Sequence, residues 1–259
     1  MTTSLSPRTL GIDAAPSAPG PIPFSRLVRV EWAKATDTRA ARWLLALVAL
    51  STIGMMLVPV LAPTTFDQTY ASYLRVAAFG LTILLPVVAI LLFTGEWSQR
   101  GVFTTFTQEP RRIRVVNAKL AVSLLMGGGA VVFGGVVTAA GLGLASASGR
   151  ALEANLTAGA VTGYLLFVLL NVFAGVALGA LLQSSSIAIA ASFALPAAFA
   201  LLGAASKLVA DWIDWSTTFN WVLENDWGGH VPQISFSVLF WVAVPLAAGV
   251  VRTMRRDVT

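Results

Sequence analysis

Six stretches of this sequence contain no Asp, Glu, Lys, Arg or His, and each is between 18 and 26 residues long. About 20 apolar residues of α-helix cross a hydrocarbon core roughly 30 Å thick. A helix pairs the backbone groups of such a stretch within the stretch itself, as lipid requires. The sequence therefore predicts an all-α integral membrane protein with six transmembrane helices, at residues 43–62, 76–94, 120–145, 159–182, 187–205 and 234–251.

The basic residues predict the orientation of these helices. Fourteen of the 17 Lys and Arg residues lie before the first span, between the second and third, or after the sixth. Because Lys and Arg stay on the cytoplasmic side, both termini and the loop between spans 2 and 3 are predicted to be cytoplasmic. The net charge of +5 thus indicates topology and contact with anionic membrane lipids. It does not indicate a nucleic-acid partner.

The chain before the first span divides into two parts. Residues 1–23 are rich in Pro, Ala and Ser, and this composition predicts a disordered tail in front of a six-span domain at 24–259. Residues 24–42 predict an amphipathic helix in the membrane interface, with Phe24, Leu27 and Trp32 on one face and basic residues elsewhere. The alternative is a plain charged lead-in to span 1.

Residues 95–119 form the largest predicted cytoplasmic segment between spans. Thr94-Gly95 is expected to end span 2, and Pro110 to end any helix that precedes it. A short cytoplasmic helix with exposed aromatic and basic side chains suits docking onto a partner protein. The alternative is an ordinary positively charged loop. The residues that favour docking are Glu96, Trp97, Phe103, Phe106, Pro110, Arg111, Arg112 and Arg114.

Residues 206–232 form the longest predicted exterior segment and contain Trp212, Trp215, Trp221 and Trp227. Trp prefers the headgroup region, so this segment predicts short amphipathic helices at the outer surface. They form either an aromatic belt or a cap over a pathway. No metal site is predicted, because the chain has no cysteine and one histidine.

The span interiors exclude several functions. They carry no ionisable residue of the kind that proton-coupled transporters, sodium-coupled transporters and intramembrane proteases use, so the chain is not expected to be an enzyme. Small residues spaced four apart predict close helix contacts, inside the bundle in preference to a dimer face. They are Gly135, Ala139 and Gly143, Gly159 and Gly163, and Gly175 and Gly179.

Three segments carry a resemblance to a known family. They are RVEWAKATDTRAARWLL at 29–45, GEWSQRGVFTTFTQEPRRIRVVNAK at 95–119 and LGALLQSSSIAIAASFALP at 178–196. The chain resembles the six-span permease subunits of ATP-binding-cassette exporters of the ABC-2 type (type V), as found in actinobacteria. The resemblance implies an interfacial helix before span 1, a coupling helix at 95–119 and a tight turn between spans 4 and 5. Many relatives carry Arg where this chain has Gln183.

The resemblance also implies partners. The chain lacks G-x-x-x-x-G-K-[ST], so ATP and Mg are expected on a separate cytoplasmic ATPase subunit and no cofactor on this chain. A second permease, identical or different, would complete the exporter in a bacterial plasma membrane. Spans 2 and 5 would line the pathway for an amphipathic or apolar cargo, with Phe79, Thr82, Ser192 and Phe193 in its wall. The alternatives are a transporter or channel that works without ATP, and a non-transporting anchor or regulatory subunit.

Overall fold

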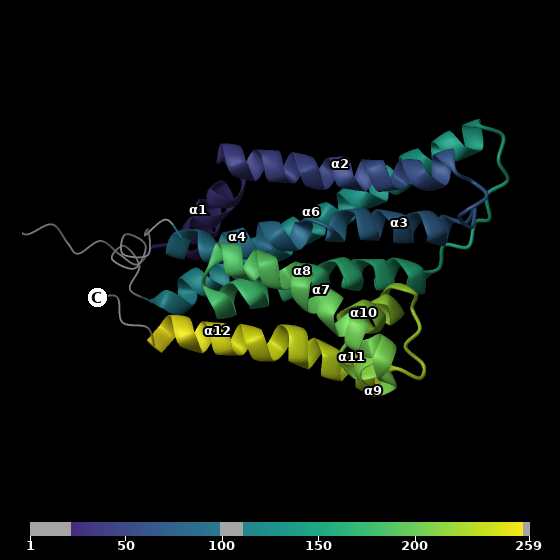
Figure 1. The fold of residues 1–259 in the computed structure, drawn as a ribbon. Coiled ribbons are helices and arrows are strands. Elements are labelled where there is room, and N and C mark those ends of the chain that lie inside the picture. Colours follow the sequence, from purple (N-terminus) through teal and green to yellow (C-terminus); the bar gives the residue numbers. More distant parts are fainter. Residues whose placement is uncertain (1–21, 99–110, 256–259) are drawn as a thin grey trace, which may run out of the picture.

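The computed structural model describes residues 22–98 and 111–255, and over these ranges the chain is a bundle of helices with one isolated β-bridge (Figure 1). Six helical segments are long and apolar enough to cross a membrane, as a multi-pass membrane protein requires. They are Arg39–Leu61, Tyr70–Glu96, Arg112–Ala147, Ala158–Leu182, Ser185–Ala205 and Val231–Arg255. The predicted number of six helices long and apolar enough to span a membrane is therefore confirmed.

The described chain ends lie at the same end of the bundle, which we call the terminal end, and the short helices α9, α10 and α11 lie toward the opposite, loop end (Figure 1). In chain order the helices are α1 (Phe24–Thr36), α2 (Arg39–Leu61), α3 (Tyr70–Thr82), α4 (Leu85–Ser98), α6 (Arg112–Ala147), α7 (Ala158–Leu182), α8 (Ser185–Ala205), α9 (Lys207–Trp212), α10 (Trp215–Leu223), α11 (Val231–Val238), the π-helical turn η1 (Leu239–Ala243) and α12 (Val244–Arg255).

The second span and α7 form the centre of the bundle. In their most apolar stretches, 72% of the second span and 61% of α7 are buried, against 6% of α8. Glycine permits the close approach: a Cβ at Gly175 would lie 2.5 Å from the carbonyl oxygen of Pro86, and one at Gly179 would lie 3.2 Å from Ile90. The stripe through Gly135 and Gly143 behaves differently, because nothing lies within 4 Å of a Cβ at either position. Its predicted packing inside the bundle is wrong.

The helix before the first span is shorter than predicted. α1 ends at Thr36, and α2 begins at Arg39 with Thr38 as its N-cap, whose hydroxyl accepts a hydrogen bond from the backbone N–H of Ala41 at 3.1 Å. An N-cap Thr stabilises the first turn of a helix by pairing a free backbone N–H, which favours a new helix at this position. Residues 39–42 therefore belong to the first span.

The second span differs from the prediction in two ways. It is interrupted near its middle, and its helix continues past Thr94-Gly95, where it was expected to end. α3 ends at Thr82, and α4 runs from Leu85 through Gly95 to Ser98. Pro86 has no N–H to continue the α3 hydrogen-bond ladder, so the break falls just before it. The third span begins at Arg112, eight residues earlier than predicted, which places the basic residues at the start of α6 in a helix.

The segment before the last span does not lie only on the surface. Trp215 and Phe219 on α10 are buried against α7 and the last span, with the Trp215 ring 5.5 Å from that of Trp241. The Trp241 indole N–H donates to the carbonyl oxygen of Ile213 at 2.7 Å. The π-helical turn just before Pro245 fits the missing proline N–H, which perturbs the hydrogen bonds of the preceding turn.

Candidate functional site

The four residues predicted to line a pathway surround one cavity of about 340 Å³, which we call the aromatic cavity. Phe79 and Thr82 come from α3, and Ser192 and Phe193 come from α8. The fold brings these two pairs together although more than 100 residues of sequence separate them. Further wall residues are Pro86, Phe167, Asn171, Pro196, Trp215, Ser216 and Phe219.

Asn171 organises the inner wall of the aromatic cavity. Its amide oxygen accepts from the indole N–H of Trp215 at 3.2 Å, and its amide nitrogen donates to the carbonyl oxygen of Phe167 at 2.8 Å. The Phe167 ring packs edge-on against Phe79, with centroids 5.7 Å apart. Sequence analysis did not single out Asn171 or Trp215 as wall residues. The available signal was that Asn171 is the one Asn within the six uncharged stretches.

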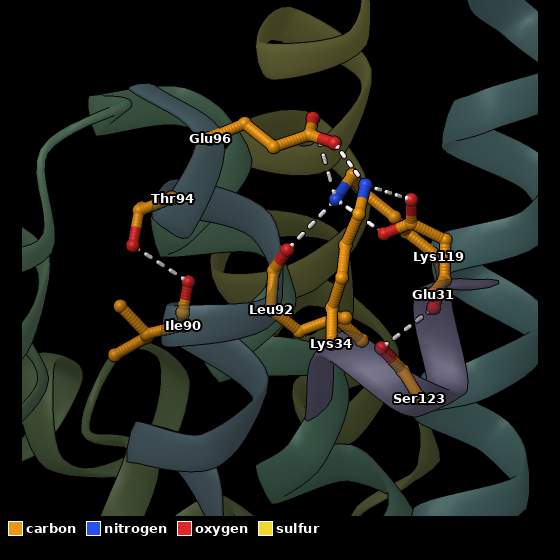
Figure 2. A network of polar contacts seen from close by, with 8 residues as sticks. All are labelled: Glu31, Lys34, Ile90, Leu92, Thr94, Glu96, Lys119 and Ser123. Atoms are coloured by element: carbon orange, nitrogen blue, oxygen red, sulfur yellow. Dashed lines mark hydrogen bonds and ion pairs between the residues drawn. The ribbon is translucent and has the colours of Figure 1, made fainter. Parts of the chain in front are cut away.

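A second polar site lies at the terminal end, where α1, α4 and α6 meet (Figure 2). Glu31, Lys34, Glu96 and Lys119, which we call the charged cluster, form a closed ring of alternating charge. Lys34 Nζ lies 2.6 Å from both Glu31 Oε1 and Glu96 Oε1, and Lys119 Nζ lies 2.7 Å from Glu31 Oε2 and 3.5 Å from Glu96 Oε2. Lys119 also donates to the carbonyl oxygen of Leu92 at 2.9 Å.

Burial makes the charged cluster a tight connection among three helices. The side chains of Glu31 and Lys119 are 4% and 6% exposed, and that of Lys34 is 39% exposed. Burial by itself lowers the pKa of Lys34, but the carboxylates of Glu31 and Glu96 outweigh it and raise the pKa above its ordinary 10.5. Removing one partner would leave a buried charge uncompensated, which typically costs about 3–5 kcal/mol.

Sequence analysis assigned Glu96 to an exposed docking segment, whereas its side chain is 11% exposed and belongs to the charged cluster. Phe103, Phe106 and Pro110 lie outside the described residues, as does the side chain of Trp97. Their predicted role in docking stays a prediction.

The basic residues after this segment contact neighbouring parts of the chain. Arg111 is the N-cap residue of α6. Arg112 donates to the carbonyl oxygen of Thr253 on α12 at 3.0 Å, and Arg114 donates to that of Ile22. Thr253 also accepts from the side chain of Gln183, whose backbone is left-handed at φ 53° and ends α7. These contacts join α6, α7 and α12 at the terminal end.

α1, which the sequence predicts to be interfacial, has an inner and an outer face. Phe24 and Trp32 are exposed and Leu27 is half-buried, while Glu31 and Ala35 are buried. The outer face keeps the aromatic character expected of a helix at a membrane surface. Sequence analysis missed Glu31, because a single acid on a mostly basic helix gives no signal of the lysine that it meets 88 positions later.

The four tryptophans before the last span occupy different environments. Trp215 is buried at the aromatic cavity, Trp212 packs edge-on against Phe236, Trp221 stacks on His230 at 3.9 Å, and the Trp227 indole donates to Asn225. They therefore do not form one belt. Within the described ranges no group of three or more His, Cys, Asp or Glu side chains could hold a metal ion.

A scan against protein-family models and a search of curated proteins found no match to this chain. The function must therefore be argued from the geometry of the aromatic cavity and the charged cluster.

Proposed function

We propose that this chain is the membrane-spanning permease subunit of an ATP-driven exporter of the ABC-2 type. The terminal end of the bundle would face the cytoplasm of a bacterial cell and bind a separate ATPase subunit. The aromatic cavity would be part of the translocation pathway, and a second permease subunit, identical or different, would complete it. ATP and Mg would bind to the ATPase.

One observation carries this proposal: α4 connects the aromatic cavity to the charged cluster. Pro86, in the first turn of α4, lines the cavity, and Glu96, in its last turns, belongs to the cluster. Ten residues of helix separate them by about 15 Å. A rigid helix of that length transmits displacement from one end to the other, as a transporter requires when its energy is supplied outside the membrane.

The position of α4 suits it for coupling. Its last residues, from Gly95 to Ser98, begin the 95–119 segment that resembles a coupling helix, and its first residues follow the break between Thr82 and Leu85. The break lets α4 move relative to α3. When the ATPase dimer closes on ATP, motion would pass through the segment 96–114 to α4 at the charged cluster, and α4 would then shift the cavity wall at Pro86.

The exposure of α8 supports a second permease next to it. Only 6% of its apolar stretch is buried within the chain, and Ile187, Phe193 and Leu201 on it are all exposed. Phe193 also lines the aromatic cavity. The open side of the cavity therefore includes a helix that a second subunit could cover, which fits a pathway between two permeases.

The test is affinity purification of the chain from its native membrane in mild detergent, followed by identification of the bound proteins and an assay of ATP hydrolysis. The proposal predicts an ATPase subunit in near-equal amount. Phe106→Asp should release that subunit without affecting membrane insertion, and Phe106→Leu should retain it. A chain that purifies alone, even after crosslinking, would support a transporter or channel that works without ATP. A bound partner with no substrate-stimulated hydrolysis would support an anchor or regulatory role.

A further inference from the structure

The wall of the aromatic cavity is uncharged and rich in aromatic rings. Phe79, Phe167, Phe193, Trp215 and Phe219 line it, and within the described part of the chain none of its wall residues is Lys, Arg, Asp or Glu. Aromatic faces attract cations through the ring quadrupole, and the attraction grows where water is excluded. The volume of about 340 Å³ is within the range of small-molecule sites. The wall therefore suits a flat or bulky apolar molecule and favours a positive charge over a negative one.

The hydroxyl groups of the wall already donate their protons to the protein. Thr82 donates to the carbonyl oxygen of Ala78 at 3.0 Å, and Ser192 donates to that of Ile189 at 2.8 Å. The indole N–H of Trp215 donates to Asn171. A hydroxyl that has donated its one proton keeps only lone pairs for a ligand. The two hydroxyls therefore act as acceptors toward the cavity.

Two prolines add backbone acceptors at the same positions. An α-helix pairs each carbonyl with the N–H four residues later, and proline has no N–H. Pro86 and Pro196 line the aromatic cavity, and the residues four positions before them are Thr82 and Ser192. Both of these residues also line the cavity, so each carries a carbonyl without its helical partner together with a hydroxyl acceptor.

The N-terminus of α10 lies beside the cavity, and it does not provide a site for an anion. α10 begins at Trp215, and its N-cap Asp214 is 4% exposed. The Asp214 carboxylate accepts from the backbone N–H of Ser216 at 3.0 Å and from its hydroxyl at 2.7 Å. The acid thus offsets the positive end of the helix and occupies the donors of Ser216, the wall residue through which an anion would otherwise bind.

We propose that the aromatic cavity binds a lipophilic cation that carries hydrogen-bond donors, such as a protonated aromatic amine or a quaternary aromatic cation with amino substituents, and disfavours anions of the same size. The aromatic faces would hold the ring system, and the acceptors at Thr82 and Ser192 would receive its N–H groups. This inference rests on the proposed function, because it names the class of cargo.

The test is equilibrium binding of ethidium, a planar aromatic cation with two amino groups, to the purified full-length complex without ATP, followed by fluorescence. Tetraphenylphosphonium and tetraphenylborate then compete for the site; they are close in size and shape and opposite in charge. The proposal predicts that the cation displaces ethidium at a concentration at least about tenfold lower than the anion, after correction for partition into protein-free micelles. Equal or stronger displacement by tetraphenylborate would overturn it.

Two conservative variants locate the binding site. Thr82→Val and Ser192→Ala each remove one hydroxyl acceptor and should weaken ethidium binding about fivefold, the size of one ordinary hydrogen bond. Ser148→Ala, at the exposed end of α6, is the matched control and should bind as the unmodified protein does. Unchanged binding in both cavity variants would place the site elsewhere. The binding assay uses no nucleotide, so a negative result would refute the cargo class without bearing on whether an ATPase subunit binds. Conversely, a chain that binds no ATPase could still prefer cations in this assay.

Discussion

The charged cluster and the aromatic cavity are both polar sites inside one bundle, joined by α4, and they satisfy their polar groups in opposite ways. The cluster has four charges, and each faces an opposite charge from within the chain. The cavity has no charge in its described wall, and the hydroxyls of Thr82 and Ser192 in that wall have donated their protons and keep only lone pairs for a ligand. A closed network stabilises an arrangement of helices, whereas an incompletely paired wall is suited to a ligand. The comparison assigns structure to one end of α4 and recognition to the other.

The largest expected effect comes from opening the charged cluster. Glu31→Leu removes the nearer carboxylate from buried Lys119, leaves only Glu96 at 3.5 Å, and should lower the free energy of unfolding by about 3–5 kcal/mol. The double variant Glu31→Leu/Lys119→Met should regain most of that loss. Titration with SDS in mixed micelles measures both. Glu153→Leu, at an exposed acid of the loop end, is the control. An equal loss of stability in this variant would show that the loss does not arise from opening the charged cluster.

Two phenylalanines of the aromatic cavity separate stability from recognition. Phe219 is fully buried, so Phe219→Ala should cost about 3–5 kcal/mol through the cavity that it leaves. Phe193 is 51% exposed, so Phe193→Ala should cost less than about 1 kcal/mol and still weaken ethidium binding. Unfolding and fluorescence measured on the same samples test this. Similar destabilisation by the two variants would contradict the assignment of Phe193 to an open wall.

A smaller effect is expected where α4 approaches α7. Gly175→Ala would place a methyl group 2.5 Å from the carbonyl oxygen of Pro86 and should destabilise by about 1–3 kcal/mol as the helices move apart. Gly143→Ala adds the same methyl group where nothing lies within 4 Å, and should be neutral or slightly stabilising. Thermal unfolding monitored by circular dichroism compares the two. Equal melting temperatures for the two variants would mean that the contact between Gly175 and Pro86 can widen without a cost in stability.

The smallest effect concerns pH and Lys34. Its raised pKa means that its contribution to stability is complete below the unfolded value of about 10.5 and is lost only as the pH rises through the higher folded value. The loss between pH 7 and 10 should be slight, because this range lies below both pKa values, and the total effect is small because the side chain is 39% exposed. Lys34→Met should reduce the alkaline decline in the melting temperature. A decline that begins below pH 9 and disappears in Lys34→Met would contradict the raised pKa.

The sequence predicts the number and approximate positions of the spans, because the absence of charge over 18 or more residues is a local signal. It does not predict their ends. The charges of Lys119 and Arg112 predict that both lie in the cytoplasmic segment 95–119, outside the spans, yet both belong to the long helix of the third span. Lys119 is buried because Glu31 and Glu96 contact it. Contacts between residues far apart in a chain leave no periodic pattern in the sequence around either partner.

The same limit applies to the aromatic cavity. The resemblance suggested spans 2 and 5 and thereby Phe79, Thr82, Ser192 and Phe193, which the fold brings together. Trp215 was instead expected at the outer surface, because Trp in an interfacial segment usually prefers headgroups. Its indole N–H has a partner inside the bundle, the amide oxygen of Asn171, and this removes the cost of burying it.

The central claim is that an ATPase moves the wall of the aromatic cavity through α4, and the absence of cysteine from the sequence allows a direct measurement. Ser192→Cys places one thiol in the cavity wall, and Ser148→Cys places one at the exposed end of α6. The rate of labelling by a water-soluble maleimide is measured on the whole complex in nanodiscs, where both membrane faces are accessible, with and without ATP and vanadate. The account predicts that nucleotide changes the rate at Ser192→Cys severalfold and leaves Ser148→Cys unchanged. Equal rates at Ser192→Cys with and without nucleotide, in nanodiscs that hydrolyse ATP, would contradict it.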